Sequence, residues 1–269
     1  MDDAQVGGGK TALISGASSG IGEALARCFA RGGFDLVLVA RSADKLEALA
    51  IDLASKYGIR AWAQPADLSR SGSARKLKLA MQRGKHAIDV LVNNAGVIEH
   101  GSFVDMPAGR HQQLIDLNVS SLTAMLAEFL PPMLARGHGR ILNVASIAAF
   151  QPVPSLATYA ATKAYVLSLS ESLSEELQGS GVSITALCPG ITATRMLAGV
   201  KAGNSQLANL PGFLISDVED VAAEAYAACI RGEVVAVPGV VNQVAVLAGR
   251  ATPKWLLRRI GGALGRRSI

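Results

Sequence analysis

The sequence predicts a single three-layer α/β domain, residues 1–269, in which helices cover both faces of a doubly wound parallel sheet of about seven strands. Two observations support this prediction. Short apolar runs alternate with helical stretches along nearly the whole chain, a pattern that favours parallel strands joined by right-handed crossovers. Half of the residues are hydrophobic, which is enough for a large core, and no linker, repeat or low-complexity segment divides the chain.

A glycine-rich turn follows the first predicted strand, residues 11–15, and precedes a helical run that extends to about residue 32. Small residues in such a turn let backbone N–H groups and the helix N-terminus approach a pyrophosphate. The spacing Gly-x-x-x-Gly-x-Gly therefore predicts a dinucleotide cradle, although a tight turn with a helix cap would use the same residues. The candidate contacts are Gly16, Ser18, Ser19, Gly20, Ile21 and Gly22.

The end of the second predicted strand, residues 34–40, indicates which nucleotide binds. Sites that prefer NAD place an acidic residue near this point, where it binds the ribose hydroxyls. Here Ala40 occupies that place and Arg41 follows it. A cation without a carboxylate suits a 2′-phosphate, so the sequence predicts NADP(H) rather than NAD(H). The alternative is a solvated arginine that begins the next helix.

Two later segments place candidate ligand-binding residues at the carboxyl ends of strands, where open α/β sheets bind ligands. After a helix over residues 42–57 and a strand over residues 59–63, Asp67 and Leu68 are predicted to begin a helical segment. Asp67 either accepts a hydrogen bond from an adenine amine or caps that helix. The fourth strand, residues 88–92, ends in a group that would equally suit an ordinary turn: Asn93, Asn94, Ala95 and Gly96.

A long helical pattern spans residues 109–134 and contains one unexpected residue, Asn118. Asparagine is a poor helix-interior residue and is costly to bury without partners. Asn118 is therefore either an exposed polar position or a buried amide that holds a water molecule or marks a local kink. The apolar residues of this segment are expected to point inward: Leu114, Leu117, Leu122, Met125, Leu126, Phe129 and Met133.

The remaining strands also end near the predicted crevice. The fifth strand, residues 140–145, ends at Ser146, whose hydroxyl can enter the crevice from there. The sixth strand, residues 182–187, ends just before Pro189 and Gly190, and residues 233–237 form a seventh. Residues 191–215 have scattered apolar residues without a strand pattern, and they are predicted to form a lid over an apolar substrate site.

Tyr159 and Lys163 lie four residues apart in a helical run over residues 157–178, so both project from one side of that helix. A nearby ammonium favours phenolate over phenol, so we expect Lys163 to lower the pKa of Tyr159 from about 10 towards neutrality. Such a tyrosine can give a proton to a substrate or take one from it. Taken alone, the pair also fits a half-buried ring beside a solvated ammonium.

The net charge of +5 comes from the C-terminal tail. Residues 250–269 hold six basic residues and no acidic one, whereas the rest of the chain has 20 basic and 21 acidic residues. A nearly neutral body gives no case for a nucleic-acid binder. Residues 240–269 are predicted to be a basic amphipathic extension, which either covers the substrate pocket or a subunit interface, or rests on an anionic membrane.

The cysteines and the N-terminus indicate the compartment. Cys28, Cys188 and Cys229 are far apart and have no metal-ligand spacing, so we expect buried thiols and no metal site. The first ten residues have no apolar run, so we expect no secretory signal. We expect a cytoplasmic protein, peripheral at the membrane surface only if the tail binds lipid.

In their order along the chain these motifs closely resemble the short-chain dehydrogenase/reductase family, in its single-domain NADP-type branch with a Rossmann-type fold. The resemblance covers roughly residues 10–239. Ser15 is a mild departure, because the family often has threonine there. The matching motifs are Gly16-x-x-x-Gly20-Ile21-Gly22, Asp67-Leu68, Asn93-Asn94-Ala95-Gly96, Asn118, Ser146, Tyr159-x-x-x-Lys163 and Pro189-Gly190 with Thr194.

The resemblance implies a catalytic tetrad of Asn118, Ser146, Tyr159 and Lys163, and a carbonyl reduction that is reversible. Tyr159 would protonate the growing alkoxide while Ser146 hydrogen-bonds the same oxygen. Lys163 would lower the pKa of Tyr159 and hold the nicotinamide ribose, and Asn118 would position a water that links Lys163 to solvent.

The resemblance also implies the remaining cofactor contacts. Ser19 and Arg41 would meet the 2′-phosphate. Asn94, Ala95 and Gly96 would line the adenosine and ribose side. The nicotinamide end would be closed by Pro189, Gly190, Ile191, Thr192 and Thr194.

These implications define the expected function. The chain would use NADPH to reduce a hydrophobic ketone, aldehyde or 3-oxoacyl substrate, because the lid is apolar and Phe103, Phe150 and Val153 lie near the site. The alternative is an NADP(H)-sensing protein with little turnover, and the intact tetrad counts against it. Family members pair through their long helices, which implies a homodimer or homotetramer.

Overall fold

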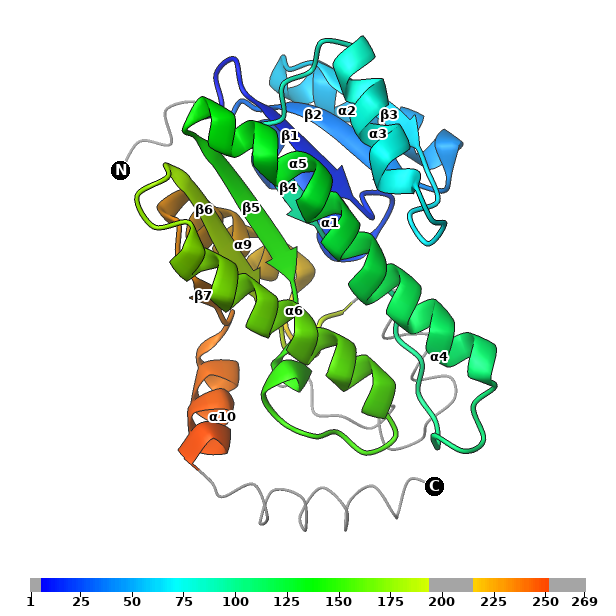
Figure 1. Ribbon diagram of the computed structural model, residues 1–269. Coiled ribbons are helices and arrows are strands. Elements are labelled where there is room, and N and C mark those ends of the chain that lie inside the picture. The colour runs from blue at the N-terminus through cyan, green and yellow to red at the C-terminus, as the bar shows by residue number, and fades with distance from the viewer. Residues whose placement is uncertain (1–5, 194–214, 252–269) are drawn as a thin grey trace.

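The computed structural model describes residues 6–193 and 215–251, and it confirms the predicted fold class. Seven parallel strands form one sheet in the order β3-β2-β1-β4-β5-β6-β7 (Figure 1). The chain builds outward from β1 in one direction and then from β4 in the other, which leaves a ligand-binding crevice between their carboxyl ends. The strands are β1 (Thr11–Ser15), β2 (Asp35–Ala40), β3 (Ala61–Pro65), β4 (Val90–Asn93), β5 (Gly139–Val144), β6 (Val182–Leu187) and β7 (Val235–Ala236).

Helices cover both faces of this sheet. Helices α1, α2 and α9 bury their apolar residues against one face, and α3, α5 and α6 bury theirs against the other. The central strands are buried on both sides, which explains why they are apolar at nearly every position rather than at alternate ones. The helices are α1 (Gly20–Arg31), α2 (Ala43–Tyr57), α3 (Ser73–Arg83), α4 (Ala108–Ile115), α5 (Leu122–Arg136), α6 (Ala157–Glu176), α9 (Val218–Arg231) and α10 (Val240–Ala251).

The long helical pattern predicted over residues 109–134 is divided in the structure. A π-helical segment, Asp116–Ser121, separates α4 from α5, and Asn118 lies buried within it. A π-helical turn contains one more residue than an α-helical turn and is frequent at functional sites. The prediction that the Asn118 amide is buried is therefore confirmed, and the exposed alternative is wrong.

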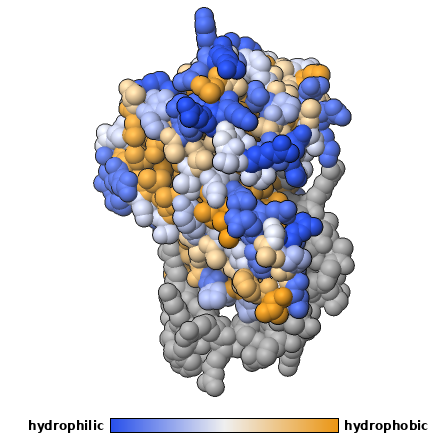
Figure 2. All heavy atoms as spheres, turned by 45° about the vertical axis from the view of Figure 1, so that its right-hand side comes forward, coloured by the Kyte–Doolittle hydropathy of each residue, from blue (hydrophilic) through white to orange (hydrophobic). Residues whose placement is uncertain are grey.

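The same region, Ala108–Arg136, is long and apolar enough to cross a membrane by length and composition alone. Many of its apolar residues pack into the core beside the sheet, among them Met125, Phe129 and Met133. This packing accounts for its composition. In the space-filling view, polar residues dominate the upper surface, whereas apolar residues are also visible at the lower end (Figure 2).

The predicted helix start at Asp67 is wrong. Helix α3 begins six residues later, at Ser73, and its N-cap is Gly72. The Asp67 carboxylate instead accepts hydrogen bonds from the N–H and hydroxyl of Ser69, at 3.1 and 2.6 Å. Asp67 therefore stabilises a turn ahead of the helix, because a short polar side chain can bond to the backbone two residues on.

Candidate active site

A cleft of about 600 Å³ lies at the carboxyl ends of the strands, and the residues predicted from separate parts of the sequence meet there. Gly22 and Asn118 do not line it, and Thr194 lies outside the described residues. Most of the predicted lid, residues 191–215, is also outside them. The predicted residues that line the cleft are Gly16, Ser18, Ser19, Gly20, Ile21, Arg41, Asp67, Leu68, Asn94, Ala95, Gly96, Ser146, Tyr159, Lys163, Pro189, Gly190, Ile191 and Thr192.

The glycine-rich turn between β1 and α1 has the geometry of an anion cradle. Gly16 has a φ of +67°, and a Cβ atom there would lie 2.6 Å from Nδ2 of Asn94. A Cβ on Gly22 would lie 2.3 Å from the Gly16 carbonyl oxygen, so Gly22 serves close packing behind the turn rather than contact with a ligand. The N-cap residue, Ser19, makes no side-chain cap hydrogen bond, which leaves the first-turn N–H groups of α1 able to bind an anion.

Ser15 holds the cradle in place, a role that the sequence analysis did not assign to it. Its hydroxyl donates to the Val92 carbonyl and accepts from the N–H groups of Asn94 and Ala95, each at 3.0 Å. The Asn94 side chain returns a hydrogen bond to the Ser15 carbonyl at 2.9 Å. These contacts join the ends of β1 and β4, the two strands between which the crevice opens. The signal available in the sequence was a hydroxyl residue directly before the first glycine.

Arg41 and Asp67 line the part of the cleft beyond β2 and β3. Arg41 is exposed, as expected for a residue that meets a phosphate at the rim. The hydrogen bond from Ser69 lowers the pKa of Asp67, and the charges of Arg70 and Arg41 lower it further. A cation and an ionised acceptor thus lie near the position expected for an adenosine ribose.

Ser146, Tyr159 and Lys163 come together at the opposite part of the cleft. Ser146 follows the end of β5, Tyr159 lies in the first turn of α6, and Lys163 follows one turn later. The Ser146 side chain is a hydrogen-bond partner of Tyr159. The Lys163 Nζ donates to the Val144 carbonyl at 2.8 Å and lies 5.7 Å from the centre of the Tyr159 ring. Lys163 is only 6% exposed, so its ammonium is held in place by the protein.

The expectation that the pKa of Tyr159 falls from about 10 towards neutrality is wrong, because the pKa is raised instead. Burial raises the pKa of Tyr159, and the hydrogen bond with Ser146 lowers it by less. Burial also lowers the pKa of Lys163 to about 8, because the charged ammonium loses its hydration. Sequence spacing shows that the two side chains are close, but it does not show how far both are removed from water.

The Asn118 side chain connects the π-helical segment to the site. Its Nδ2 donates to the Val97 carbonyl at 2.9 Å and to Thr162 Oγ1 at 3.2 Å, and its Oδ1 accepts from the Val97 N–H at 2.9 Å. Both amide hydrogens are therefore used within the protein. Asn118 fixes the chain after β4 against the turn of α6 that precedes Lys163, and its role toward a water molecule stays a prediction.

A buried polar chain beneath the site was missed from the sequence. Nδ2 of Asn93 donates to Oδ1 of Asn143, and Nδ2 of Asn143 donates to the Ser170 hydroxyl, both at 2.9 Å. Asn143 and Ser170 are fully buried, so these bonds lie in the interior, where an unsatisfied amide is costly. The chain joins β4 and β5 to α6, the helix that carries Tyr159 and Lys163. Its signal within β5 was Asn143, an asparagine among the apolar residues at the end of that strand.

The part of the cleft beside Ser146 and Tyr159 is apolar. Val153 lines it, as predicted, but Phe103 and Phe150 do not, and Phe103 is 62% exposed. The other apolar side chains that line this part are Ile98, Leu117, Ile147, Leu156 and Ile191.

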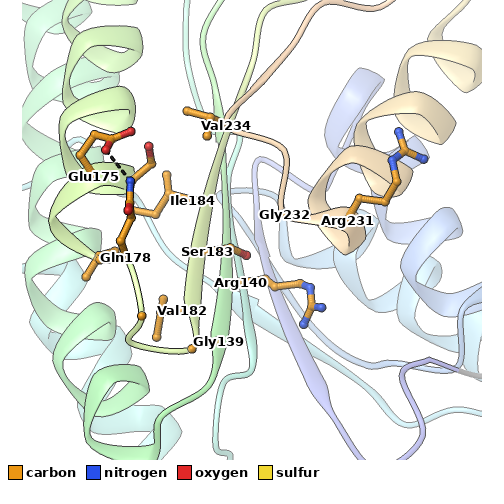
Figure 3. Close-up of a pocket in the computed structure, with 14 residues that line it drawn as sticks. Gly139, Arg140, Glu175, Gln178, Val182, Ser183, Ile184, Arg231, Gly232 and Val234 are labelled. Atoms are coloured by element: carbon orange, nitrogen blue, oxygen red, sulfur yellow. Dashed lines mark hydrogen bonds between the residues drawn. The ribbon is translucent and has the colours of Figure 1, made fainter.

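A second hollow of about 480 Å³ lies at the amino ends of β5 and β6, away from all the predicted site residues (Figure 3). Arg140 lines it and donates to the Ile230 carbonyl at 3.1 Å, and Arg231 pairs with Glu233 at 2.7 Å. Its charged groups are thus already partnered within the protein. Across the residues that the structure describes, no group of three or more His, Cys, Asp or Glu side chains could hold a metal ion.

Comparisons with known proteins agree with this geometry. Residues 10–205 match the short chain dehydrogenase family. Oxidoreductase UcpA of Escherichia coli (strain K12) is 41% identical over 190 residues, which are 70% of this chain and 71% of UcpA.

Two solved structures are similar over nearly the whole chain. A short-chain dehydrogenase from Sphingobium yanoikuyae in complex with NADPH has a TM-score of 0.80 at 36% identity and covers 90% of this chain and 93% of its own. A bulky-bulky ketone specific alcohol dehydrogenase from Comamonas testosteroni has a TM-score of 0.75 at 30% identity and covers 91% of this chain and 95% of its own. The ordered motifs, the fold and these matches lead to one conclusion: the chain belongs to the short-chain dehydrogenase/reductase family.

Proposed function

We propose that the protein is an NADPH-dependent oxidoreductase that reduces a hydrophobic ketone, aldehyde or 3-oxoacyl substrate to the alcohol, in a reversible reaction. The observation that carries this proposal is the group of Ser146, Tyr159 and Lys163 in the wall of a cleft that continues into the glycine cradle. An acid–base residue beside a dinucleotide cradle is the arrangement that hydride transfer to a carbonyl requires.

The residues of the cleft fit NADP(H). The uncapped N-terminus of α1 suits the pyrophosphate, and Gly16 has no room for a side chain between the cradle and Asn94. Arg41 supplies the cation for a 2′-phosphate, and the similar dehydrogenase from Sphingobium yanoikuyae was solved with NADPH. When bound, NADPH supplies the hydride.

The protein's own groups manage the proton and the developing charge. Tyr159 Oη gives its proton to the substrate oxygen as negative charge grows there. The Ser146 hydroxyl donates a hydrogen bond to the same oxygen, and it is already adjacent to Tyr159. The Lys163 ammonium, held by the Val144 carbonyl, stabilises the tyrosinate that remains.

The lining of the cleft supports an apolar substrate. Aliphatic side chains, Val153 and Leu156 among them, line the same cleft as Ser146 and Tyr159. An apolar wall with a few convergent polar groups is typical of a small-molecule site. The similar enzyme from Comamonas testosteroni is specific for bulky ketones, which is consistent with this substrate class.

The test is turnover of a panel of aliphatic, aromatic and 3-oxoacyl carbonyl compounds with NADPH. Tyr159→Phe should lower kcat by about 10²–10⁴, the usual contribution of a positioned acid–base group. Tyr165→Phe is the matched control, because Tyr165 lies on the same helix but is 40% exposed and bonds Thr123 instead. Equal turnover by wild type and Tyr159→Phe would refute the mechanism. Tight NADPH binding without turnover across the panel would favour the regulatory alternative.

We also propose a homodimer or homotetramer paired through α5 and α6. Leu134 on α5 and Tyr165 on α6 are large hydrophobic residues exposed on these helices, at 39% and 40%. Sedimentation equilibrium measures the assembly, and Leu134→Glu should weaken it. A monomer across the micromolar range would contradict this part of the proposal.

A further inference from the structure

Helix α10 exposes a stripe of large apolar residues to solvent. The stripe consists of Val240, Val241, Val244 and Leu247, and their exposed fractions are 74%, 51%, 61% and 70%. At about 100° of rotation per residue these four side chains fall within roughly a third of the helix circumference. A single exposed valine is ordinary, but a continuous stripe on one helix marks an interaction surface.

The stripe points away from the protein, whereas the opposite side of α10 faces the body. Asn242 and Val246 lie on that opposite side and are partly buried. The Asn242 side chain donates to the Pro238 carbonyl at 2.7 Å, and it fills the space where a Cβ on Gly190 would lie. An amphipathic helix usually packs its apolar side against the domain. Helix α10 instead contacts the domain through the side that carries the Asn242 amide, and most of its large apolar residues face outward.

Other exposed apolar residues lie at the same end of the molecule. Helix α10 and the loop before α4 both lie beyond the carboxyl ends of the strands, where the cleft opens (Figure 1). Phe103 and Val104 in that loop are 62% and 85% exposed. Where the lower end of the molecule is not grey, apolar and polar residues are both visible at the surface in the space-filling view (Figure 2).

The charge of the chain that continues from α10 identifies the partner. Residues 250–269 carry six basic residues and no acidic one, interspersed with apolar residues that include Trp255. Two stripes from separate copies would bring two such tails together, and their like charges would repel. The rest of the chain is nearly neutral, so it offers no strongly acidic body for the tail to bind. An anionic lipid bilayer matches both features, because its apolar interior can bury the stripe and its anionic headgroups can bind the basic tail.

We propose that the α10 stripe and the basic tail dock this protein on an anionic lipid bilayer, with the mouth of the cleft facing the membrane. The stripe enters the acyl boundary and the cations of the tail contact lipid phosphates. This docking is independent of the reaction proposed above.

The test is co-sedimentation of the full-length protein with vesicles of phosphatidylcholine alone or mixed with phosphatidylglycerol, at low and high salt. The protein should sediment with the mixed vesicles and be released by salt, because screening removes the attraction to anionic lipid. Leu247→Asp should lower the bound fraction about tenfold, since a large apolar side chain no longer enters the boundary. Replacing Arg258 and Arg259 by Gln should weaken binding to mixed vesicles only.

The matched control is Ile51→Asp, the same kind of change at an aliphatic residue that is 71% exposed on α2. This variant should bind vesicles like the wild type, and NADPH binding by both Asp variants checks their folding. No sedimentation with mixed vesicles, or equal loss in the Leu247 and Ile51 variants, would overturn the proposal. So would a change of oligomeric state caused by Leu247→Asp in the absence of lipid, because the stripe would then be an interface between copies.

Discussion

The two ends of the sheet carry hollows of similar size but of different character. The cleft at the carboxyl ends has a volume of about 600 Å³, and the hollow at the amino ends has a volume of about 480 Å³. Residues of β5 line both of them, and the segments that follow β5 and β6 also line the cleft. At the carboxyl end, Lys163 is buried with a shifted pKa and Tyr159 is half-buried beside Ser146. At the amino end, Arg231 is 61% exposed and paired with Glu233.

This difference shows that volume does not identify a site in this fold. Two features distinguish the carboxyl end. The ionisable side chain of Lys163 is buried there, which lowers its pKa and destabilises the fold, and the N-terminus of α1 has no side-chain cap. The carboxyl ends of the strands therefore hold the candidate active site, and the amino ends form a structural end without catalytic groups among the residues that line its hollow. Variants in matched pairs, one from each hollow, test this distinction.

The largest effect on NADPH affinity is expected for Gly22→Ala. Its new methyl group would lie 2.3 Å from the Gly16 carbonyl, so the cradle must shift, and overpacking of this kind costs about 1–3 kcal/mol. NADPH affinity, measured by fluorescence titration, should fall about 10–100-fold. Gly139→Ala at the other hollow would crowd Met133 at 2.7 Å and should lower stability while NADPH affinity is unchanged. Equal loss of affinity in both variants would remove the distinction between the two ends.

Arg41→Ala should have the next largest effect. A hydrogen bond to a charged group contributes about 1.5–3 kcal/mol, so NADPH affinity should fall about 10–100-fold while NADH affinity stays the same. The paired control, Arg231→Ala, should change neither. An unaltered preference for NADPH over NADH in the Arg41 variant would show that another residue selects the cofactor.

Lys163→Met should abolish activity and yet stabilise the fold at pH 7 by up to about 3 kcal/mol, because one unit of pKa shift corresponds to about 1.4 kcal/mol. Burial lowers the pKa of Lys163 from 10.5 to about 8, so below pH 8 the folded protein holds a charge that the unfolded chain holds more easily. Between about pH 8 and 10.5 the folded protein has released this proton and the unfolded chain has not, so wild-type stability rises with pH relative to the variant.

Calorimetry of Lys163→Met and wild type across this pH range measures the effect. The stability difference should shrink as the pH rises from 8 towards 10.5. Lys76→Met, at an exposed position on α3, is the control and should show no such trend. A difference independent of pH would mean that the stabilisation comes from packing and not from removal of a buried charge.

The smallest effect is expected for Ser183→Ala in the hollow at the amino ends. This substitution should change the free energy of unfolding by less than about 0.5 kcal/mol and leave NADPH affinity and kcat unchanged. Urea denaturation and steady-state kinetics check this expectation. A clear loss of activity would show that the structural end contributes to function.

The sequence predicted those features that depend on local pattern. Strands β1 and β6 have the predicted bounds, and Ser146 and Tyr159 lie in the predicted crevice, because strand ends in a parallel sheet converge on one edge. The features that depend on distant partners were missed. The shift in the pKa of Tyr159 requires knowledge of burial, and the bonds from Asn143 to Asn93 and Ser170 require three elements to be placed.

The errors at helix boundaries have a similar cause. Short polar residues such as Asp67 favour both helix caps and turns, so the sequence alone does not separate the two. The hydrogen bonds from Ser69 specify the turn. The sequence indicated the π-helical segment only through Asn118, an asparagine inside a helical pattern. Its extra residue is specified by the bonds that Asn118 makes to Val97 and Thr162 across the fold.

The π-helical segment, Asp116–Ser121, changes how the two helices on either side of it are phased. One extra residue turns all that follows by about 100°, so α4 can direct its contacts to α6 while α5 directs its own to α3 and the sheet. Deleting a single residue here would preserve a long amphipathic helix but rotate Asn118 away from Val97. The active site therefore depends on the number of residues in this helix as much as on which residues they are.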